Sequence, residues 1–164
     1  MVLTTERLRI VPLTLPRLKL WVSDAAALEQ ELGCRNAAAL MSDEFGRIVT
    51  GQYAAALSDR DNLLFYTFWL LITRTDGKAT GSACFKGGPN AAGEVEIGYG
   101  LEKTFEKQGY MTEAVRELCK WALAQPDVRH IIAETDAENG ASQRLLQRTG
   151  FRQYRSGATQ WWRL

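Results

Sequence analysis

The chain has few of the residues on which metal, disulfide and membrane chemistry depend. Its 164 residues include four prolines, the single histidine His130 and three cysteines, Cys34, Cys84 and Cys119. A catalytic zinc or a serine–histidine triad would rest on that one histidine, because no CxxC pair or Cys/His cluster is present. The longest apolar run, residues 63–72, is shorter than the roughly 20 residues of a membrane-spanning helix. We therefore expect no metal, no membrane partner, and reduced cysteines in a cytoplasmic protein.

Charge of one sign is also scarce. Twenty Lys and Arg residues stand against nineteen Asp and Glu, a net charge of +1, so we expect no nucleic-acid partner. A chain of this length buries roughly 68–70% of the surface that its unfolded form exposes, so its core needs no disulfides or metal ions for stability. Repeats, linkers and low-complexity segments are absent. We expect one domain over residues 1–164, as a monomer or a homodimer.

Hydrophobic periodicity predicts an α/β order with a mixed sheet. The N-terminal third reads as a strand followed by helices, with Thr14 as a cap and Gly33 as a stop; one helix or two short ones fit residues 15–32 equally well. Three meandering strands follow, then a helix, a strand, a helix and two strands. The expected elements are a strand at 8–13, helices within 15–32 and 36–57, strands at 63–73, 79–86 and 94–99, a helix at 111–122, a strand at 129–135, a helix at 141–148, and strands at 151–154 and 159–164.

The loop over residues 102–111 joins a strand directly to a helix. Backbone amides at the start of a helix have no partner within that helix, and the helix dipole adds a positive end. Such a turn suits a pyrophosphate, and Gly109 would let a ligand approach the backbone closely. An ordinary helix start has the same appearance, so the loop alone does not decide between the two interpretations.

Three motifs, one of which overlaps this loop, help to interpret it. They are Gly98-Tyr99-Gly100-Leu101, then Gln108-Gly109-Tyr110-Met111-Thr112-Glu113-Ala114, then Asn139-x-x-Ser142-x-x-Leu145-Leu146-x-Arg148-x-Gly150-Phe151. In order and spacing they resemble the acetyl-CoA core of GNAT superfamily N-acetyltransferases, over about residues 80–155. The branch of ribosomal-protein N-terminal acetyltransferases is the most similar, and the opening residues 5–10 resemble the first strand of that branch.

The resemblance implies an α/β fold with a GNAT-like mixed, mostly antiparallel central sheet, splayed after strand 4 and flanked by helices. It implies acetyl-CoA as the acyl donor, with its pantetheine arm in the splay against the backbone of Gly100 and Leu101. Asn139 would hydrogen-bond that arm, or cap a helix, or do both. The pyrophosphate would lie on the amides of Lys107, Gln108, Gly109, Tyr110, Met111 and Thr112.

Four positions depart from the family pattern. Glu106 and Met111 stand at the first and last positions of the loop, where the family has Arg or Gln and Gly or Ala. Lys107 occupies a frequent glycine position. Leu146 stands where many members carry the tyrosine that protonates the departing thiolate. A backbone cradle tolerates side chains that point away from it, but Glu106 near phosphates would weaken cofactor binding, which Lys107 could offset.

Acetyl transfer to an amine needs a neutral nucleophile, a stabilised oxyanion and a protonated thiolate. A lysine-like amine of pKa about 10.4 lies roughly 3.4 units from neutrality at pH 7, a cost of about 4.6 kcal/mol, so a base is useful. Glu96 matches the carboxylate that this branch places near the acceptor, whereas Glu94 is expected to face solvent. Ser142 matches a serine that some relatives place near the thioester sulfur, although a serine in the first turn of a helix often only caps it.

The acceptor is less well defined. Residues 21–62 carry seven acidic and three basic side chains, and an acidic wall would favour a cationic small molecule or a peptide N-terminus. We expect an N-acetyltransferase that moves an acetyl group from acetyl-CoA to a primary amine by direct attack in a ternary complex. The alternative is a catalytically silent module that binds acyl-CoA as a sensor or partner.

Overall fold

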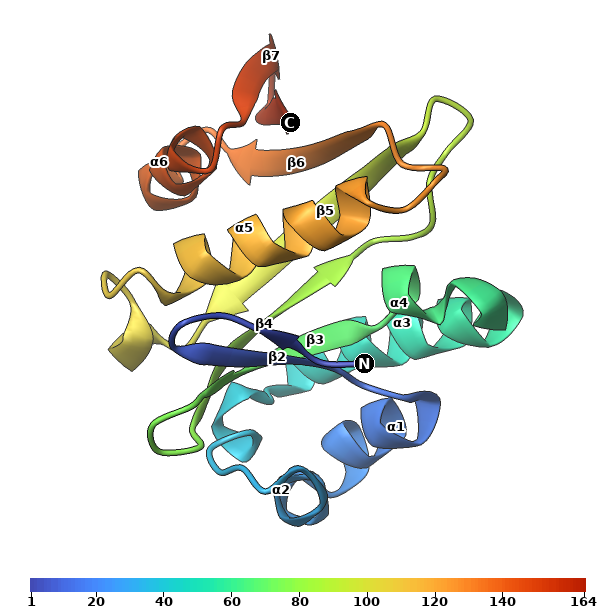
Figure 1. The fold of residues 1–164 in the computed structure, drawn as a ribbon, viewed down its shortest axis with the longest axis vertical. Coiled ribbons are helices and arrows are strands. Elements are labelled where there is room, and N and C mark those ends of the chain that lie inside the picture. The colour runs from blue at the N-terminus through green and yellow to red at the C-terminus, as the bar shows by residue number, and fades with distance from the viewer.

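The computed structural model describes residues 1–164 as a twisted mixed sheet with helices on both faces (Figure 1). The strands are β1 (Leu3–Thr4), β2 (Leu8–Pro12), β3 (Phe68–Thr73), β4 (Ala79–Phe85), β5 (Glu94–Leu101), β6 (His130–Asp136), β7 (Arg152–Ser156) and β8 (Thr159–Arg163). The α-helices are α1 (Leu15–Ser23), α2 (Ala25–Leu32), α3 (Asp43–Ser58), α4 (Leu63–Tyr66), α5 (Tyr110–Leu123) and α6 (Gly140–Arg148). Three short 3-10 helices complete the elements: η1 (Ala38–Leu40), η2 (Arg60–Asn62) and η3 (Lys103–Phe105). No helix is both long and apolar enough to cross a bilayer.

The strands lie in the order β1-β2-β3-β4-β5-β6-β8-β7. Every neighbouring pair is antiparallel except β5 and β6, which are parallel and connected through α5. The predicted mixed, mostly antiparallel sheet is therefore confirmed. A parallel pair needs a crossover connection, and α5 supplies it.

The sheet separates two apolar layers. Phe68, Leu70 and Ile72 of β3 pack on the side of α1, α2 and α3, whereas Trp69 and Leu71 pack on the side of α5 and α6. All six residues of β3 are buried, because a central strand covered on both faces needs apolar side chains on both. Figure 1 shows α5 lying across one face and α1 to α3 on the other side of the sheet.

The N-terminal helical region divides into two helices at Asp24. This residue leaves the helical conformation, and its side chain accepts a hydrogen bond from the amide of Ala27 at 3.0 Å, so it caps α2. Gly33 ends α2 with a φ of 60°, the left-handed conformation that glycine adopts without strain. Thr14 precedes α1 as predicted, but its side chain forms no capping hydrogen bond.

The expected strand over residues 63–73 is wrong in its first part. Leu63–Tyr66 forms α4, and β3 begins only at Phe68. Pairing of β3 with β4 starts at Phe68, so the preceding residues have no neighbouring strand to bond with. A helical turn satisfies their backbone instead, and the amide of Thr67 donates to the carbonyl of Leu63 at 2.8 Å.

The strands β5 and β6 separate partway along their length. Their pairing covers three residues of each strand and ends at Glu96 and Ile132. β5 nevertheless continues to Leu101 and β6 to Asp136. The splay after strand 4 is confirmed, because β5 is the fourth strand once the two-residue β1 is set aside.

Substitution of Gly81 in β4 would test how closely β4 and β5 pack. A Cβ atom on Gly81 would lie 2.2 Å from the carbonyl oxygen of Gly100 and 2.9 Å from Cα of Leu101. We expect Gly81→Ala to lower the free energy of unfolding by about 1–3 kcal/mol, measured by urea denaturation. Gly51→Ala on α3 is the control, because no atom lies within 4 Å of its added Cβ; it should raise stability by about 0.5–1 kcal/mol. Equal stability of the two variants would contradict this packing.

Candidate functional site

The backbone of β5 beyond the splay has one bonded edge and one free edge. The amide of Lys86 donates to the carbonyl of Glu96 at 2.9 Å. In the same register, the amide of Glu102 donates to the carbonyl of Thr80 at 2.9 Å. Residues of an antiparallel strand alternate in the direction of their backbone groups. The even-numbered residues of β5 therefore bond toward β4.

The odd-numbered residues face the splay. By the same alternation, the backbone groups of Tyr99 and Leu101 point toward the edge that β6 has left. Gly100 bonds toward β4 instead, but a Cβ on it would meet no atom within 4 Å, so the space beside it is open. The backbone groups of Tyr99 and Leu101 are therefore free to pair with a ligand. Gly100 contributes open space beside the strand, not a free backbone edge.

The loop before α5 carries six consecutive backbone amides without a partner in the protein. They run from Lys107 to Thr112; the first bonded amides on either side are those of Glu106, to Lys103, and Glu113, to Gly109. The predicted set of amides is therefore unpaired throughout. Free N–H groups at the positive end of a 14-residue helix form an environment that favours an anion such as a diphosphate.

Two left-handed residues shape this loop. Lys107 has a φ of 60° and Gly109 has a φ of 83°. The first of these explains why the family favours glycine at the position of Lys107, since a side chain there is strained. Left-handed residues within a turn direct successive N–H groups toward one concave side.

The two unusual loop side chains, Glu106 and Met111, differ in their surroundings. Met111 is 4% exposed and packs in the core beneath α5. Glu106 lies in an extended conformation before the left-handed residue and is exposed to solvent. Met111 is thus directed into the core, and the effect of Glu106 on a bound phosphate stays a prediction.

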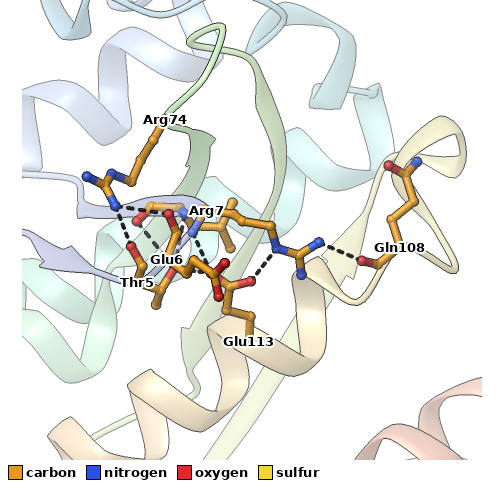
Figure 2. A network of polar contacts seen from close by, with 7 residues as sticks. Thr5, Glu6, Arg7, Arg74, Gln108 and Glu113 are labelled. Atoms are coloured by element: carbon orange, nitrogen blue, oxygen red, sulfur yellow. Dashed lines mark hydrogen bonds and ion pairs between the residues drawn. The ribbon is translucent and has the colours of Figure 1, made fainter.

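The loop is held from behind by the first residues of the chain (Figure 2). Glu113 of α5 accepts hydrogen bonds from the Thr5 hydroxyl, from the Arg7 amide at 2.8 Å and from Arg7 Nε at 2.7 Å. Arg7 Nη1 donates to the carbonyl of Gln108 at 2.9 Å, and its guanidinium lies 4.6 Å from the centre of the Tyr110 ring. Arg7 and Glu113 therefore form a clamp between the bend that precedes β2 and the start of α5, which was not predicted from the sequence.

The clamp orients the peptide bond that opens the cradle. A trans peptide is planar, with its C=O and N–H pointing in opposite directions. Because Arg7 holds the carbonyl of Gln108, the amide of Gly109 is turned away from Arg7. The signal for this role was present in the motifs at residues 5–10 and 108–114, but single-sequence reasoning could not pair residues so far apart.

Glu96 lies at the last paired position of β5, on the face opposite Tyr99. Its carboxylate forms an ion pair with Lys86 Nζ, and its side chain is 20% exposed. The carboxylate is thus at the splay, as predicted, but already has a cationic partner. An ammonium group beside Glu96 is compatible with this site.

Glu94 is engaged on the same face of β5. Its carboxylate accepts from Arg163 at 2.8 Å and from the side-chain amide of Asn90 at 3.2 Å. The side chain is only 17% exposed, so it is less open to solvent than expected. Its partners fasten β8 and the β4–β5 turn to β5, which is a structural role.

Asn139 and Ser142 start α6 on the other side of the splay. Asn139 Oδ1 accepts from the amide of Ser142 at 3.1 Å, which confirms the capping interpretation. Its side-chain amide nitrogen has no protein partner, so it remains available as a donor to a ligand. Ser142 Oγ lies 2.7 Å from the hydroxyl of Tyr99. In the sequence Tyr99 appears only as part of the motif Gly98-Tyr99-Gly100-Leu101, and nothing there indicates this contact.

Leu146 and the cysteines do not offer an acid or a nucleophile. Leu146 is fully buried in the core beneath α5 and α6. Burial raises the pKa of Cys34 to about 11, and of Cys84 and Cys119 to about 12. These thiols stay protonated at neutral pH, and the reactive form of cysteine is the thiolate.

Several acidic side chains of residues 21–62 already bind neighbouring groups of the protein. Besides the cap formed by Asp24, Glu31 pairs with Arg17 at 2.7 Å and Asp59 accepts from Asn62. Two surface hollows, of about 450 and 520 Å³, are lined mainly by residues outside the splay and the cradle. A cationic acceptor stays a prediction.

Comparison with known proteins agrees with this geometry. The family described as "Acetyltransferase (GNAT) domain" matches residues 7–152. The curated relative "Uncharacterized N-acetyltransferase YjdG" of Bacillus subtilis (strain 168) is 27% identical over 154 residues, which cover 91% of this chain and 88% of YjdG.

Solved structures share the fold across the whole chain. A putative GnaT-family acetyltransferase from Bordetella pertussis has a TM-score of 0.70 at 21% identity and covers 99% of this chain and 98% of its own. RimL, described as a ribosomal L7/L12 alpha-N-protein acetyltransferase in complex with coenzyme A, has a TM-score of 0.67 at 17% identity and covers 100% and 97%. The similarity to the ribosomal-protein branch is therefore one of fold.

Replacement of the clamp guanidinium tests its effect on the cradle. Arg7→Lys keeps the charge but cannot bond both Glu113 and the Gln108 carbonyl in one planar fork. We expect the dissociation constant for coenzyme A to rise about tenfold in calorimetric titration. Arg9→Lys, two residues further along the chain in β2, is the control; Arg9 donates to the Leu32 carbonyl, and its replacement should leave the dissociation constant unchanged. An unchanged affinity in Arg7→Lys would show that the clamp does not orient the cradle.

The clamp also predicts how stability depends on pH. Burial raises the pKa of Glu113, but hydrogen bonds from Thr5 and Arg7 outweigh that effect and hold it below the ordinary 4.5. A carboxylate with a lowered pKa in the folded state stabilises fully above its unfolded pKa and loses that contribution as pH falls through the folded pKa. The stability difference between wild type and Glu113→Gln should thus be constant above about pH 6 and shrink below about pH 4.5, measured by urea unfolding. A difference that stays the same down to pH 3 would contradict this role for Glu113.

Proposed function

Because this chain belongs to the GNAT family of acetyltransferases, we propose that it transfers the acetyl group of acetyl-CoA to a primary amine by direct attack in a ternary complex. The observation that carries the proposal is the run of six unpaired amides, Lys107 to Thr112, leading from the splayed strand into α5. These amides would bind the diphosphate. The free edge of β5 and the amide nitrogen of Asn139 would bind the pantetheine arm.

The thioester would then lie between two chemically different faces of β5. Glu96 and Tyr99 are three residues apart on this strand, so their side chains project to opposite faces. Glu96 would take a proton from the acceptor ammonium, directly or through water. An amide on the free edge of β5, such as that of Tyr99, would stabilise the oxyanion, and Ser142 would face the sulfur.

Direct attack is supported by the state of the cysteines. An acetyl-enzyme formed on cysteine would need a thiolate, and burial keeps all three thiols protonated at neutral pH. In the proposed reaction the amine itself would be the nucleophile. Its acceptor molecule would be a protein N-terminus, the acceptor class named for RimL, or a cationic small amine.

The ion pair between Lys86 and Glu96 motivates a second candidate. In a catalytically silent module that binds acyl-CoA, Glu96 would serve only to fix Lys86 on the sheet. In an enzyme, the acceptor ammonium would replace Lys86 on the carboxylate. The two candidates predict the same coenzyme binding and differ only in turnover.

Removal of the carboxylate charge separates them. Thiol release from acetyl-CoA should be measured with labelled donor against N-terminal peptides, polyamines and amino sugars. We expect Glu96→Gln to lower kcat/KM at least about tenfold, some 1.4 kcal/mol of transition-state stabilisation, with acetyl-CoA affinity unchanged. Glu94→Gln is the matched control, on the same face of the same strand, and should retain activity. Tight binding of acetyl-CoA without turnover of any amine would favour the silent module.

A further inference from the structure

Two hydroxyl groups bridge the splay where the backbone no longer does. Tyr99 projects from β5 beyond the last residue paired with β6, and Ser142 projects from the first turn of α6. Their oxygens lie 2.7 Å apart. The Ser142 backbone is itself fixed by the cap from Asn139. The two hydroxyls therefore occupy a defined position at the edge of the gap.

Each hydroxyl has one hydrogen to donate, and either one can be the donor in this pair. If Ser142 donates to Tyr99, the free hydrogen is on tyrosine; if Tyr99 donates, it is on serine. A thiolate accepts hydrogen bonds and has none to donate, so the hydroxyl that faces the sulfur must carry the free hydrogen. Under the proposed function that hydroxyl is Ser142, and Tyr99 is then the donor to it.

We propose that Tyr99 is a positioning residue that donates its hydroxyl hydrogen to Ser142 and thereby directs the Ser142 hydroxyl toward the departing thiolate of coenzyme A. This inference rests on the proposed function. Its structural support is the bridge across the splay at 2.7 Å. It also explains how the site works with the apolar, fully buried Leu146 on α6.

The protonation state of Tyr99 suits a permanent donor. Burial raises the pKa of Tyr99 above its ordinary value of 10, although the hydrogen bond with Ser142 opposes this shift. The phenol therefore keeps its hydrogen throughout the pH range in which the enzyme would work.

The step balances without a proton leaving either hydroxyl. The neutral amine, having lost its proton to Glu96, forms a C–N bond to the thioester carbon. The attacking nitrogen then carries a positive charge and gives up one of its two remaining protons to water. When the tetrahedral intermediate collapses, the C–S bond breaks and its electron pair goes to sulfur, which leaves a neutral amide. Ser142 stabilises that thiolate by a hydrogen bond. Since an ordinary thiol has a pKa of about 8.5, the released thiolate takes its proton from water at neutral pH.

The test combines kinetics with titration of the bound thiol. Tyr99→Phe, Ser142→Ala and the double variant would be compared with wild type for kcat, for coenzyme A affinity and for melting temperature. The pKa of the thiol of bound coenzyme A would be followed by thiolate absorbance, with desulfo-coenzyme A as the blank. Tyr154→Phe, an exposed tyrosine on β7, is the control.

We expect each single variant to lower kcat about tenfold and to raise the bound thiol pKa by about one unit, because the same hydrogen bond to the thiolate is lost. The double variant should be no worse than either single one, since the two residues act as one unit. Affinity and melting temperature should change little, because Tyr99→Phe keeps the ring.

Two results would overturn the proposal. One is an unchanged kcat and thiol pKa in Tyr99→Phe; the other is a full additional loss when Ser142→Ala is added to it. The thiol titration needs only coenzyme A binding. A wild type that acetylates no amine, yet shows the expected thiol shift in both variants, would refute the proposed function and leave the arrangement of Tyr99 and Ser142 supported.

Discussion

The short parallel contact between β5 and β6 determines where chemistry can take place in this molecule. Three paired residues hold the strands together, and beyond them the sheet opens between two layers that remain packed on either side. An open sheet edge inside a protein leaves backbone groups that need partners. The loop that follows β5 adds six unpaired amides. In the proposed function, the break in pairing between β5 and β6 would supply both the space for an extended ligand and backbone groups to bind it.

The two faces of β5 then carry different chemistry. One face presents charged groups that are already paired, Glu96 with Lys86 and Glu94 with Arg163. The other presents the neutral hydroxyls of Tyr99 and Ser142. In the proposed reaction, the period-two alternation of the strand would keep the carboxylate that accepts the amine proton apart from the hydroxyls that face the sulfur. A thioester bound in the splay would lie within reach of the groups on both faces of β5.

Much of this arrangement could be predicted from the sequence, and the failures have physical causes. The order of most elements along the chain follows from local periodicity, and the unpaired amides and the cap at Asn139 follow from motifs that act through the backbone. The splay was expected only from the resemblance to the family. The helix at Leu63–Tyr66 was missed because its apolar residues suit a strand, and only the absence of a neighbouring strand excludes it. The partners Arg7, Lys86 and Tyr99 were missed because each meets its counterpart through tertiary packing, which spacing along the chain does not encode.

The clamp between Arg7 and Glu113 joins residues 106 positions apart. Contacts of such separation require a large loop to close and form late in folding, after local helices and hairpins. A growing chain would possess the first strand long before α5 exists to meet it. Coenzyme bound at this loop would accordingly favour molecules in which the first residues and α5 have already come together, and would stabilise the assembled chain.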